Sequence, residues 1–368
     1  MHLRPRRQVT TAGLAICAVA LAACSSSSSS STTSSSTSSS STASGSASAG
    51  NLNGTLNGSG STFQLTYQQA SIQSFKTVQP SMTVNYGGGG SGKGRTDLAS
   101  GTVNYAGSDS TIPAAEEAGF KGKTVLYFPV IVGPITLSYN LSGLSKPLQL
   151  SAPVIAGIFD GKITKWNDSA IAADNPGVTL PSTPIAIAVR SDSSGTTANF
   201  TKFLTEAAGS AWTLGSSSIV KWPATAHAAS GNGGVAQVIK STPGAIGYVD
   251  YSTAKASSLT FASIKNKDGS YVAPSVQSAT AAADNATVKP DDTFTAIWAP
   301  GATSYPITYQ SYVLVYQTQP NANDAAMLKA YIGYLLGDGQ KLLPQLNYAP
   351  LPSNIDQQAT AQLSKISG

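Results

Sequence analysis

The chain has 368 residues, of which only 11% are charged, and a formal net charge of +5 at pH 7. Without Arg4, Arg6 and Arg7, which lie close together in the opening MHLRPRRQ, 19 basic and 17 acidic residues remain, and no basic tract is left to attract nucleic acid. The remaining stretch of residues 52–368 is too long for one hydrophobic core and predicts two domains.

The first 24 residues are predicted to be an export signal. After the basic start, VTTAGLAICAVALAA is apolar but shorter than the roughly 20 residues that span a bilayer. Its end, LAAC at residues 21–24, resembles a bacterial lipobox; an ordinary signal peptide with an incidental cysteine is the alternative. We expect a lipid anchor at Cys24, which would place the protein at the outer face of the cytoplasmic membrane or in the periplasm.

Residues 25–51 are predicted to be a disordered tether, because serine and threonine at this density cannot bury apolar area. The only cysteines of the chain are Cys17 and Cys24, and the only histidine beyond residue 2 is His227. The folded region therefore has no disulfide, no thiolate metal site and no cysteine nucleophile, and a multi-histidine metal site is excluded. We expect neither a metal nor a cofactor.

The first Gly/Ser/Thr turn of the folded region opens NGSGSTFQLTYQQASIQSFKTVQP, at residues 57–80. Its apolar period predicts a helix that ends before Pro80 and starts after Ser61, Thr62 and Phe63. The predicted buried face consists of Leu65, Ile72, Phe75 and Val78.

The next turn, GGGGSGK at residues 87–93, nearly completes the phosphate loop of ATP-splitting enzymes. That loop requires a hydroxyl after the lysine to hold magnesium, and here the residue is Gly94. An exported protein also meets little ATP. The sequence therefore disfavours a nucleotide site and leaves Ser91 as a hydroxyl in a glycine-rich turn.

A strand, VNYAG, is predicted before Ser108, Asp109 and Ser110. Asp109 either caps a turn, which is common for aspartate, or faces a ligand site at the carboxyl end of its strand. A carboxylate beside an anion is favourable if the ligand has a proton to donate. Phosphate has one at neutral pH and sulfate has none, so Asp109 would accept the proton and repel sulfate.

The third turn follows the predicted buried strand IAIAV and contains Arg190 in RSDSSGTT. The helix after it is predicted to bury Phe200, Phe203 and Leu204. Beyond the leader the chain has only two arginines, Arg95 and Arg190, and both lie in or beside Gly/Ser-rich turns. The planar fork of arginine grips an oxyanion with two parallel hydrogen bonds.

A helix N-terminus attracts anions through its unpaired N–H groups. Each of the three turns could instead hold an ordinary Ser or Thr cap. Together, with Arg190 in one of them, they favour a shared oxyanion site.

These stretches resemble the substrate-binding protein of the bacterial high-affinity phosphate ABC transporter over nearly the whole region after the tether. The resemblance rests on GSGSTF at residues 58–63, GGGGSGKG, GSDS and RSDSSGT at residues 190–196. IFDGKITKWNDSAIAADNPGVTLP, GNGGVAQVIKSTPGAIGYVDY and SYPITYQSYVLV extend it. RSDSSGT and STPGAIGYVDY are the more specific matches.

The resemblance implies a set of phosphate ligands: Thr62, Phe63 (through its backbone N–H), Ser91, Asp109, Arg190, Ser194, Gly195 and Thr196. Asp192 would orient Arg190. Ser193 departs from the family, which usually has glycine there; serine would be strained if the turn needs φ > 0. Lys93 and Arg95 replace more neutral residues. They either raise the local positive potential or are simply solvated, and we expect the second.

The resemblance also implies an α/β periplasmic-binding-protein fold of type II, with a cleft between two domains joined by two crossing strands. Residues 52–132 plus 303–368 would form the N-terminal lobe and residues 133–302 the second lobe. YFPVIVGPITLSYN and SYPITYQSYVLVYQ are the expected crossings. The lobes would close around the anion.

The implied function is extracytoplasmic capture of inorganic phosphate by a monomer, for delivery to the permease of an ABC importer. One alternative is a different oxyanion; Asp109 argues against sulfate but not against arsenate, and molybdate stays open. A secreted phosphatase-like or acyl-transferring enzyme is a second alternative, with SIVK at residues 218–221 as its only motif. A surface adhesin is a third, and it leaves the placement of Arg190 unexplained.

Overall fold

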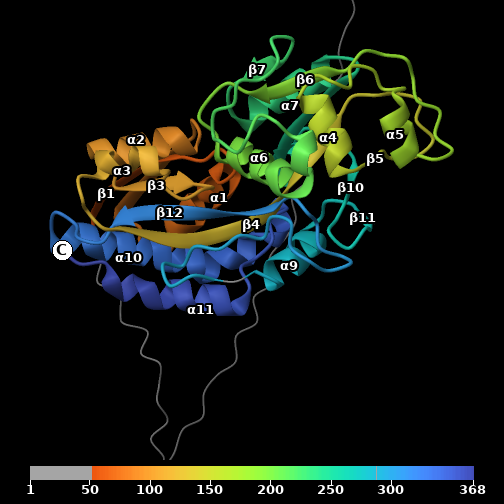
Figure 1. The fold of residues 1–368 in the computed structure, drawn as a ribbon. Coiled ribbons are helices and arrows are strands. Elements are labelled where there is room, and N and C mark those ends of the chain that lie inside the picture. Colours follow the sequence, from red (N-terminus) through yellow and green to blue (C-terminus); the bar gives the residue numbers. More distant parts are fainter. Residues whose placement is uncertain (1–51, 287) are drawn as a thin grey trace, which may run out of the picture. The chain divides into compact units, whose positions relative to one another are not determined.

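The computed structural model describes residues 52–286 and 288–368, which all belong to one compact unit, Ser48–Gly368 (Figure 1). The predictions on the signal peptide, on Cys24 and on the tether lie outside the described residues. Within the described ranges, no helix has both the length and the apolar character that a membrane span needs.

The main sheet has nine strands in the order β2-β1-β3-β12-β4-β8-β6-β7, with β9 beside β4. Its strands are β1 (Gly54–Gly60), β2 (Met82–Gly87), β3 (Tyr105–Ser108), β4 (Val125–Tyr139), β6 (Ala186–Arg190), β7 (His227–Ala229), β8 (Ala245–Asp250), β9 (Thr260–Phe261) and β12 (Thr308–Tyr316). A small second sheet contains β5 (Gln149–Leu150), β10 (Ser263–Lys265) and β11 (Tyr271–Val272).

Helices cover the strands on both faces (Figure 1). The α-helices are α1 (Leu65–Phe75), α2 (Ser91–Ser100), α3 (Ala114–Glu117), α4 (Ala152–Phe159), α5 (Ser169–Asp174), α6 (Gly195–Ala207), α7 (Gly231–Ser241), α8 (Tyr251–Ala256), α9 (Val276–Asp284), α10 (Ala322–Leu336) and α11 (Ser353–Gln362). Short 3-10 helices span Ala118–Phe120, Gly209–Ala211, Asp338–Leu342, Pro344–Leu346 and Leu363–Lys365.

Strand β4 changes its partner halfway along. Residues 125–134 pair with β12, whereas residues 135–139 pair with β8. We call β2, β1, β3, β12 and residues 125–134 the first half-sheet, and residues 135–139, β8, β6 and β7 the second half-sheet. β4 is buried along almost its whole length, as expected for a central strand covered on both faces. The lobe boundaries given above stay a prediction, with which this change of partner is consistent.

Parallel pairing determines where the polar loops meet. β1 runs parallel to β2 and β3 in the first half-sheet, and β6 runs parallel to β7 and β8 in the second. Parallel strands place their carboxyl ends at the same edge, which is where α/β sheets bind ligands. In each half-sheet the polar turns that the sequence analysis identified follow these ends.

The buried face predicted for α1 is confirmed only in part: Phe75 is buried, Ile72 is half-buried against the core, and Leu65 is half-buried. The structure buries Tyr67, Gln68, Ser71 and Phe75, and Val78 lies beyond the helix with 52% of its surface exposed. Polar residues are tolerated inside because they are hydrogen-bonded. The Tyr331 hydroxyl donates to Gln68 Oε1 at 2.7 Å, and the Tyr67 hydroxyl donates to the Leu335 carbonyl at 2.6 Å. The buried face of α6, with Phe200, Phe203 and Leu204, is confirmed.

Candidate functional site

The loops at the carboxyl ends of the two half-sheets are joined by hydrogen bonds. The Gly92 N–H donates to the Ser193 carbonyl at 3.0 Å. The Asn199 side-chain amide donates to the Asp109 carbonyl at 2.7 Å, and the Asn232 N–H donates to Thr62 Oγ1 at 3.3 Å. The structure therefore brings the three predicted turns and Asp109 together.

Asp109 directly follows β3 and is 2% exposed. Its Oδ1 accepts hydrogen bonds from the hydroxyls of Ser61 and Ser311, both at 2.5 Å. Among the residues that the structure describes, its Oδ2 has one long hydrogen bond, from Ser91 Oγ at 3.4 Å. One carboxylate oxygen is thus fully engaged by the protein, and the other can accept a further proton donor.

The electrostatic surroundings of Asp109 favour it as a proton acceptor. Burial raises the pKa of Asp109, and the hydroxyls of Ser311 and Ser61 together with the charge of Arg190 offset part of that rise. A carboxylate with a raised pKa accepts a hydrogen bond more strongly than one in water. Asp109 is therefore suited to a ligand that presents an O–H.

Arg190 is the last residue of β6, and its side chain is 1% exposed. Its Nε donates to Asp192 Oδ1 at 2.8 Å, its second terminal nitrogen pairs with Asp192 Oδ2, and Nη1 donates to Asn232 Oδ1 at 2.8 Å. Burial acts to raise the pKa of Asp192, but the hydrogen bonds and charge of Arg190 outweigh it and lower that pKa. The expected ion pair between Arg190 and Asp192 is present, and it fixes the plane of the guanidinium.

Asn232 and Asp250 belong to the same network and were missed by the sequence reasoning. Asn232, 1% exposed near the start of α7, donates to Asp250 Oδ2 at 2.8 Å while it accepts from Arg190. Burial raises the pKa of Asp250 to about 6. Asp250 ends β8, so the strand-end rule that identified Asp109 would have found it. Asn232 has no such signal beyond its place among glycines before a helix.

The start of α6 supplies further donors. The Ser194 hydroxyl accepts from the Thr197 N–H at 3.1 Å as the helix N-cap. The N–H groups of Gly195 and Thr196 precede the first intrahelical bonds, so the helix itself leaves them without acceptors. Gly195 lies against the first half-sheet, because a β-carbon there would stand 2.3 Å from Ser91 Oγ and 2.6 Å from the Asp109 Cβ. Only glycine allows this approach.

The glycine run of residues 87–90 has a similar role. Gly90 has φ +93°, and a β-carbon there would lie 2.3 Å from Asp192 Oδ2 and 2.6 Å from the Ser193 carbonyl oxygen. The run lets the loop before α2 lie directly against the Arg190 turn. Ser193 has no positive φ, so the strain anticipated for serine at this position does not arise. The Ser193 hydroxyl donates to Ser218 Oγ at 3.1 Å.

Thr62 and Phe63 lie between β1 and α1. Thr62 is half-buried, and its hydroxyl oxygen accepts from the Asn232 N–H. The Phe63 N–H, which the resemblance assigns as a ligand, donates to Ser61 Oγ at 3.1 Å. The Phe63 ring is buried and stacks on Tyr309, with ring centroids 4.2 Å apart.

The prediction that Arg95 is solvated is wrong. Arg95 is fully buried and binds Glu116 with two nitrogens, at 2.6 and 2.9 Å. Its Nη1 also donates to the hydroxyls of Ser108 and Ser110, at 3.1 and 3.2 Å. It is buried because a carboxylate and two hydroxyls satisfy its donors, and it holds the residues on either side of Asp109. Lys93 is solvated as expected, with 54% of its side chain exposed.

We expect Arg95→Ala to lower the free energy of unfolding by about 2–3 kcal/mol, somewhat less than for a fully buried pair because Glu116 is 34% exposed. Lys93→Ala, which removes an exposed i,i+4 pair with Asp97, should cost at most about 0.5 kcal/mol. Denaturant unfolding of both variants tests this. If Arg95→Ala lowered the free energy of unfolding no more than Lys93→Ala does, the buried hydrogen bonds of Arg95 would add nothing to stability beyond an exposed ion pair.

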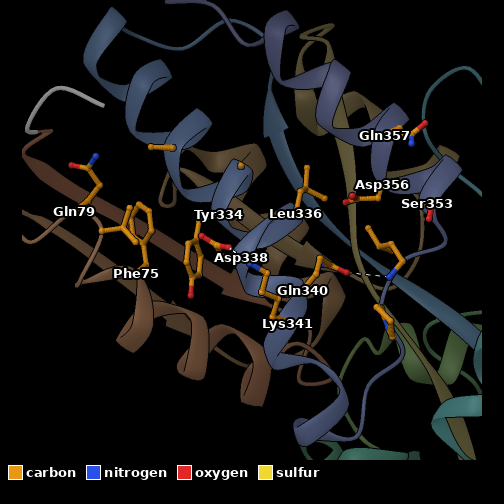
Figure 2. Close-up of a pocket in the computed structure, with 16 residues that line it drawn as sticks. Phe75, Gln79, Tyr334, Leu336, Asp338, Gln340, Lys341, Ser353, Asp356 and Gln357 are labelled. Atoms are coloured by element: carbon orange, nitrogen blue, oxygen red, sulfur yellow. Dashed lines mark hydrogen bonds and ion pairs between the residues drawn. The ribbon is translucent and has the colours of Figure 1, made fainter. Parts of the chain in front are cut away.

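A hollow of about 810 Å³ lies elsewhere, between α1, α10 and α11 (Figure 2). Its lining includes the apolar side chains of Phe75, Tyr334 and Leu336 and the carboxylates of Asp338 and Asp356. None of the predicted site residues lines it. The hollow is therefore separate from the site around Asp109 and Arg190.

Comparisons with known proteins agree with this architecture. Residues 29–339 match the family described as "PBP superfamily domain". The chain is 34% identical over 322 residues to "Phosphate-binding protein PstS 3" of Mycobacterium leprae. The matched region covers 85% of this chain and 87% of that protein. It is 35% identical over 313 residues to "Phosphate-binding protein PstS" of Pasteurella multocida, covering 84% and 89%.

Among solved structures, the high-affinity periplasmic phosphate-binding protein PfluDING, bound with phosphate, has a similar fold. Its TM-score is 0.69 at 22% identity, over 84% of this chain and 94% of that one. The likeness extends to the two-domain α/β architecture. The chain thus belongs to the periplasmic-binding-protein superfamily and, within it, to the family of the phosphate-binding proteins PstS.

Proposed function

We propose that the protein captures inorganic phosphate outside the cytoplasm and delivers it to an ABC importer. One observation carries the proposal: a weakly engaged carboxylate oxygen, Asp109 Oδ2, lies in the same buried site as Arg190 and the start of α6. Such a site suits an anion that also has a proton to donate. The names of the relatives, all phosphate-binding proteins, support the same ligand.

In this proposal the donors and the acceptor have separate tasks. Arg190, oriented by Asp192, neutralises the charge of the anion, and the N–H groups of Gly195 and Thr196 bind its oxygens at the positive end of α6. The hydroxyls of Thr62, Ser91, Ser194 and Thr196 complete the set of ligands. The N–H of Phe63 would join them by exchanging its hydrogen bond to Ser61 Oγ for one to phosphate. Asp109 Oδ2 accepts the phosphate proton and repels an anion that has none.

The wider proposal follows from the contacts between the half-sheets. Because Thr62 and Asp109 belong to one set of loops and Asn232 and Gly195 to the other, the described contacts correspond to a closed form of the two predicted lobes. An open form would admit the anion, and closure would form both sets of hydrogen bonds. The closed surface would be the one that the permease recognises.

The remaining parts of the proposal concern how the protein is held. The lipid anchor at Cys24 would keep it at the outer face of the membrane, and the tether would let it reach the permease. We also propose that the protein is a monomer and that it binds its ligand without catalysis, since its relatives are named as phosphate-binding proteins.

Equilibrium dialysis of Ser48–Gly368 against labelled phosphate tests the proposed ligand. We expect retention of about one phosphate per chain, displacement by unlabelled phosphate and by arsenate, which has the same proton, and no displacement by molybdate or sulfate. Displacement by molybdate at equal concentration would indicate a general oxyanion carrier. Release of phosphate from an added ester would instead revive the enzyme hypothesis.

A further inference from the structure

Tyr309 has an orphaned hydroxyl in the middle of the protein. The residue lies on β12, where it pairs with Gly133 of β4, and it is 0% exposed. Its hydroxyl is shielded from solvent and has no hydrogen-bond partner among the described residues. A buried hydroxyl without a partner carries its full desolvation cost, so such groups are rare in folded proteins.

The ring of Tyr309 is held in place by its neighbours. It stacks on the Phe63 ring at a centroid distance of 4.2 Å, with the ring planes 25° apart. A β-carbon on Gly133 would lie 2.9 Å from the Phe63 ring, so the Phe63 ring packs directly against the strand beside Tyr309. Tyr309 therefore cannot easily turn its hydroxyl towards another partner.

Tyr309 lies beside the site on β12. Ser311, two residues further along and therefore on the same face of the strand, donates to Asp109 Oδ1 at 2.5 Å. Burial raises the pKa of Tyr309 well above its usual value, the charges of Asp109 and Asp250 raise it further, and contact with the Thr196 hydroxyl acts in the opposite direction. These influences agree with the geometry: Tyr309 stacks on Phe63, which follows β1, and shares a face of β12 with Ser311, which bonds Asp109. The raised pKa keeps the hydroxyl protonated at neutral pH. Thr196 does not satisfy it, since the two hydroxyls form no hydrogen bond.

We propose that the Tyr309 hydroxyl is a further ligand of the phosphate site and donates a hydrogen bond to the bound anion. The inference rests on the proposed function, because it adds a donor to the same site. It goes beyond the set of ligands that the family resemblance assigns, all of which come from the turns after β1, β3 and β6 and from the loop before α2. Tyr309 adds a donor from β12, which pairs with β4 where the two half-sheets meet.

The test compares two tyrosines of the same strand. Tyr309→Phe removes the orphaned hydroxyl. Tyr312→Phe removes a hydroxyl that is also buried but bonds to the backbone of Phe294 at 3.0 Å. Phosphate affinity and the thermal midpoint of the phosphate-free protein are measured for wild type and both variants of Ser48–Gly368.

We expect Tyr309→Phe to bind phosphate about 10- to 100-fold more weakly, the loss typical of one hydrogen bond to a charged group. Its phosphate-free midpoint should stay equal or rise, because an unsatisfied group is removed. Tyr312→Phe should lower the midpoint and leave the affinity unchanged.

Two results would overturn the inference. One is wild-type affinity in Tyr309→Phe, and the other is a fall of its phosphate-free midpoint as large as that of Tyr312→Phe, which would reveal a partner within the protein. If wild type itself bound no phosphate, the proposed function would fail first. The wild-type titration thus separates the two failures.

Discussion

Arg190→Ala is expected to reduce phosphate affinity by about 100- to several thousand-fold, because two charge-assisted hydrogen bonds are worth about 3–5 kcal/mol together. The charge of Asp192 would then remain near the anion without its partner and add repulsion. The variant should still fold, although with reduced stability, since a pair that is largely buried has been broken. Calorimetric titration gives the affinity and circular dichroism checks the fold.

Two comparisons make the Arg190 prediction specific. Arg190→Lys keeps the charge but loses the planar fork, so it should recover only part of the affinity. Lys202→Ala removes a cation from the exposed side of α6, where the lysine is 38% exposed, and should bind like wild type. Unchanged affinity in Arg190→Ala would refute the arginine clamp.

Asp109→Asn is expected to reduce the preference for phosphate over sulfate by at least about tenfold, from the gain and loss of one hydrogen bond each. The asparagine carbonyl can still accept from Ser61 and Ser311 in the place of Oδ1. Its amide then replaces Oδ2, so an acceptor for the phosphate proton becomes a donor to any anion oxygen. Phosphate should bind more weakly and sulfate more tightly.

Asp97→Asn is the matched control for that prediction. Asp97 bonds to Ser59 and Lys93 near the surface, and among the described residues its carboxylate forms no hydrogen bond with a candidate ligand of the site. Its variant should keep the selectivity of wild type. If Asp109→Asn also kept it, Asp109 could not be the group that distinguishes the two anions.

The candidate site residues that the structure brings together as the sequence predicted are those with a local signal. Arg190, Asp192 and the start of α6 lie in one continuous turn, so strand pattern, turn residues and helix start identify them together. Asp109 follows the same rule, because it stands where a buried strand ends. For these residues a few neighbours along the chain determine the position.

The errors and omissions involve partners that are distant in the sequence. Arg95 was expected in solvent, but Glu116 and the hydroxyls beside Asp109 bury it. Gln68 was not among the residues predicted to be buried on α1, but Tyr331 satisfies it inside. Asn232 and Tyr309 gain their significance only through residues of other strands and helices, and no local pattern marks them.

The glycine run shows how one motif can have two physical explanations. Glycines that would cradle a phosphate chain in a nucleotide-binding loop also allow two protein loops to touch. Gly90 and Gly92 do the latter, since β-carbons there would collide with Asp192 and Ser193. The sequence disfavours a nucleotide, but only the structure identifies which loop the glycines approach.

The most direct test of the central claim is calorimetric titration of Ser48–Gly368, stripped of bound anion, first with phosphate and then with sulfate. The account predicts tight one-to-one binding of phosphate and no heat from sulfate. Arg190 would bind either anion, but Asp109 would accept a hydrogen bond only from an anion that has a proton, which phosphate has and sulfate lacks. No phosphate binding, or equal binding of sulfate, would contradict it and leave the family relationship as a description of the fold alone.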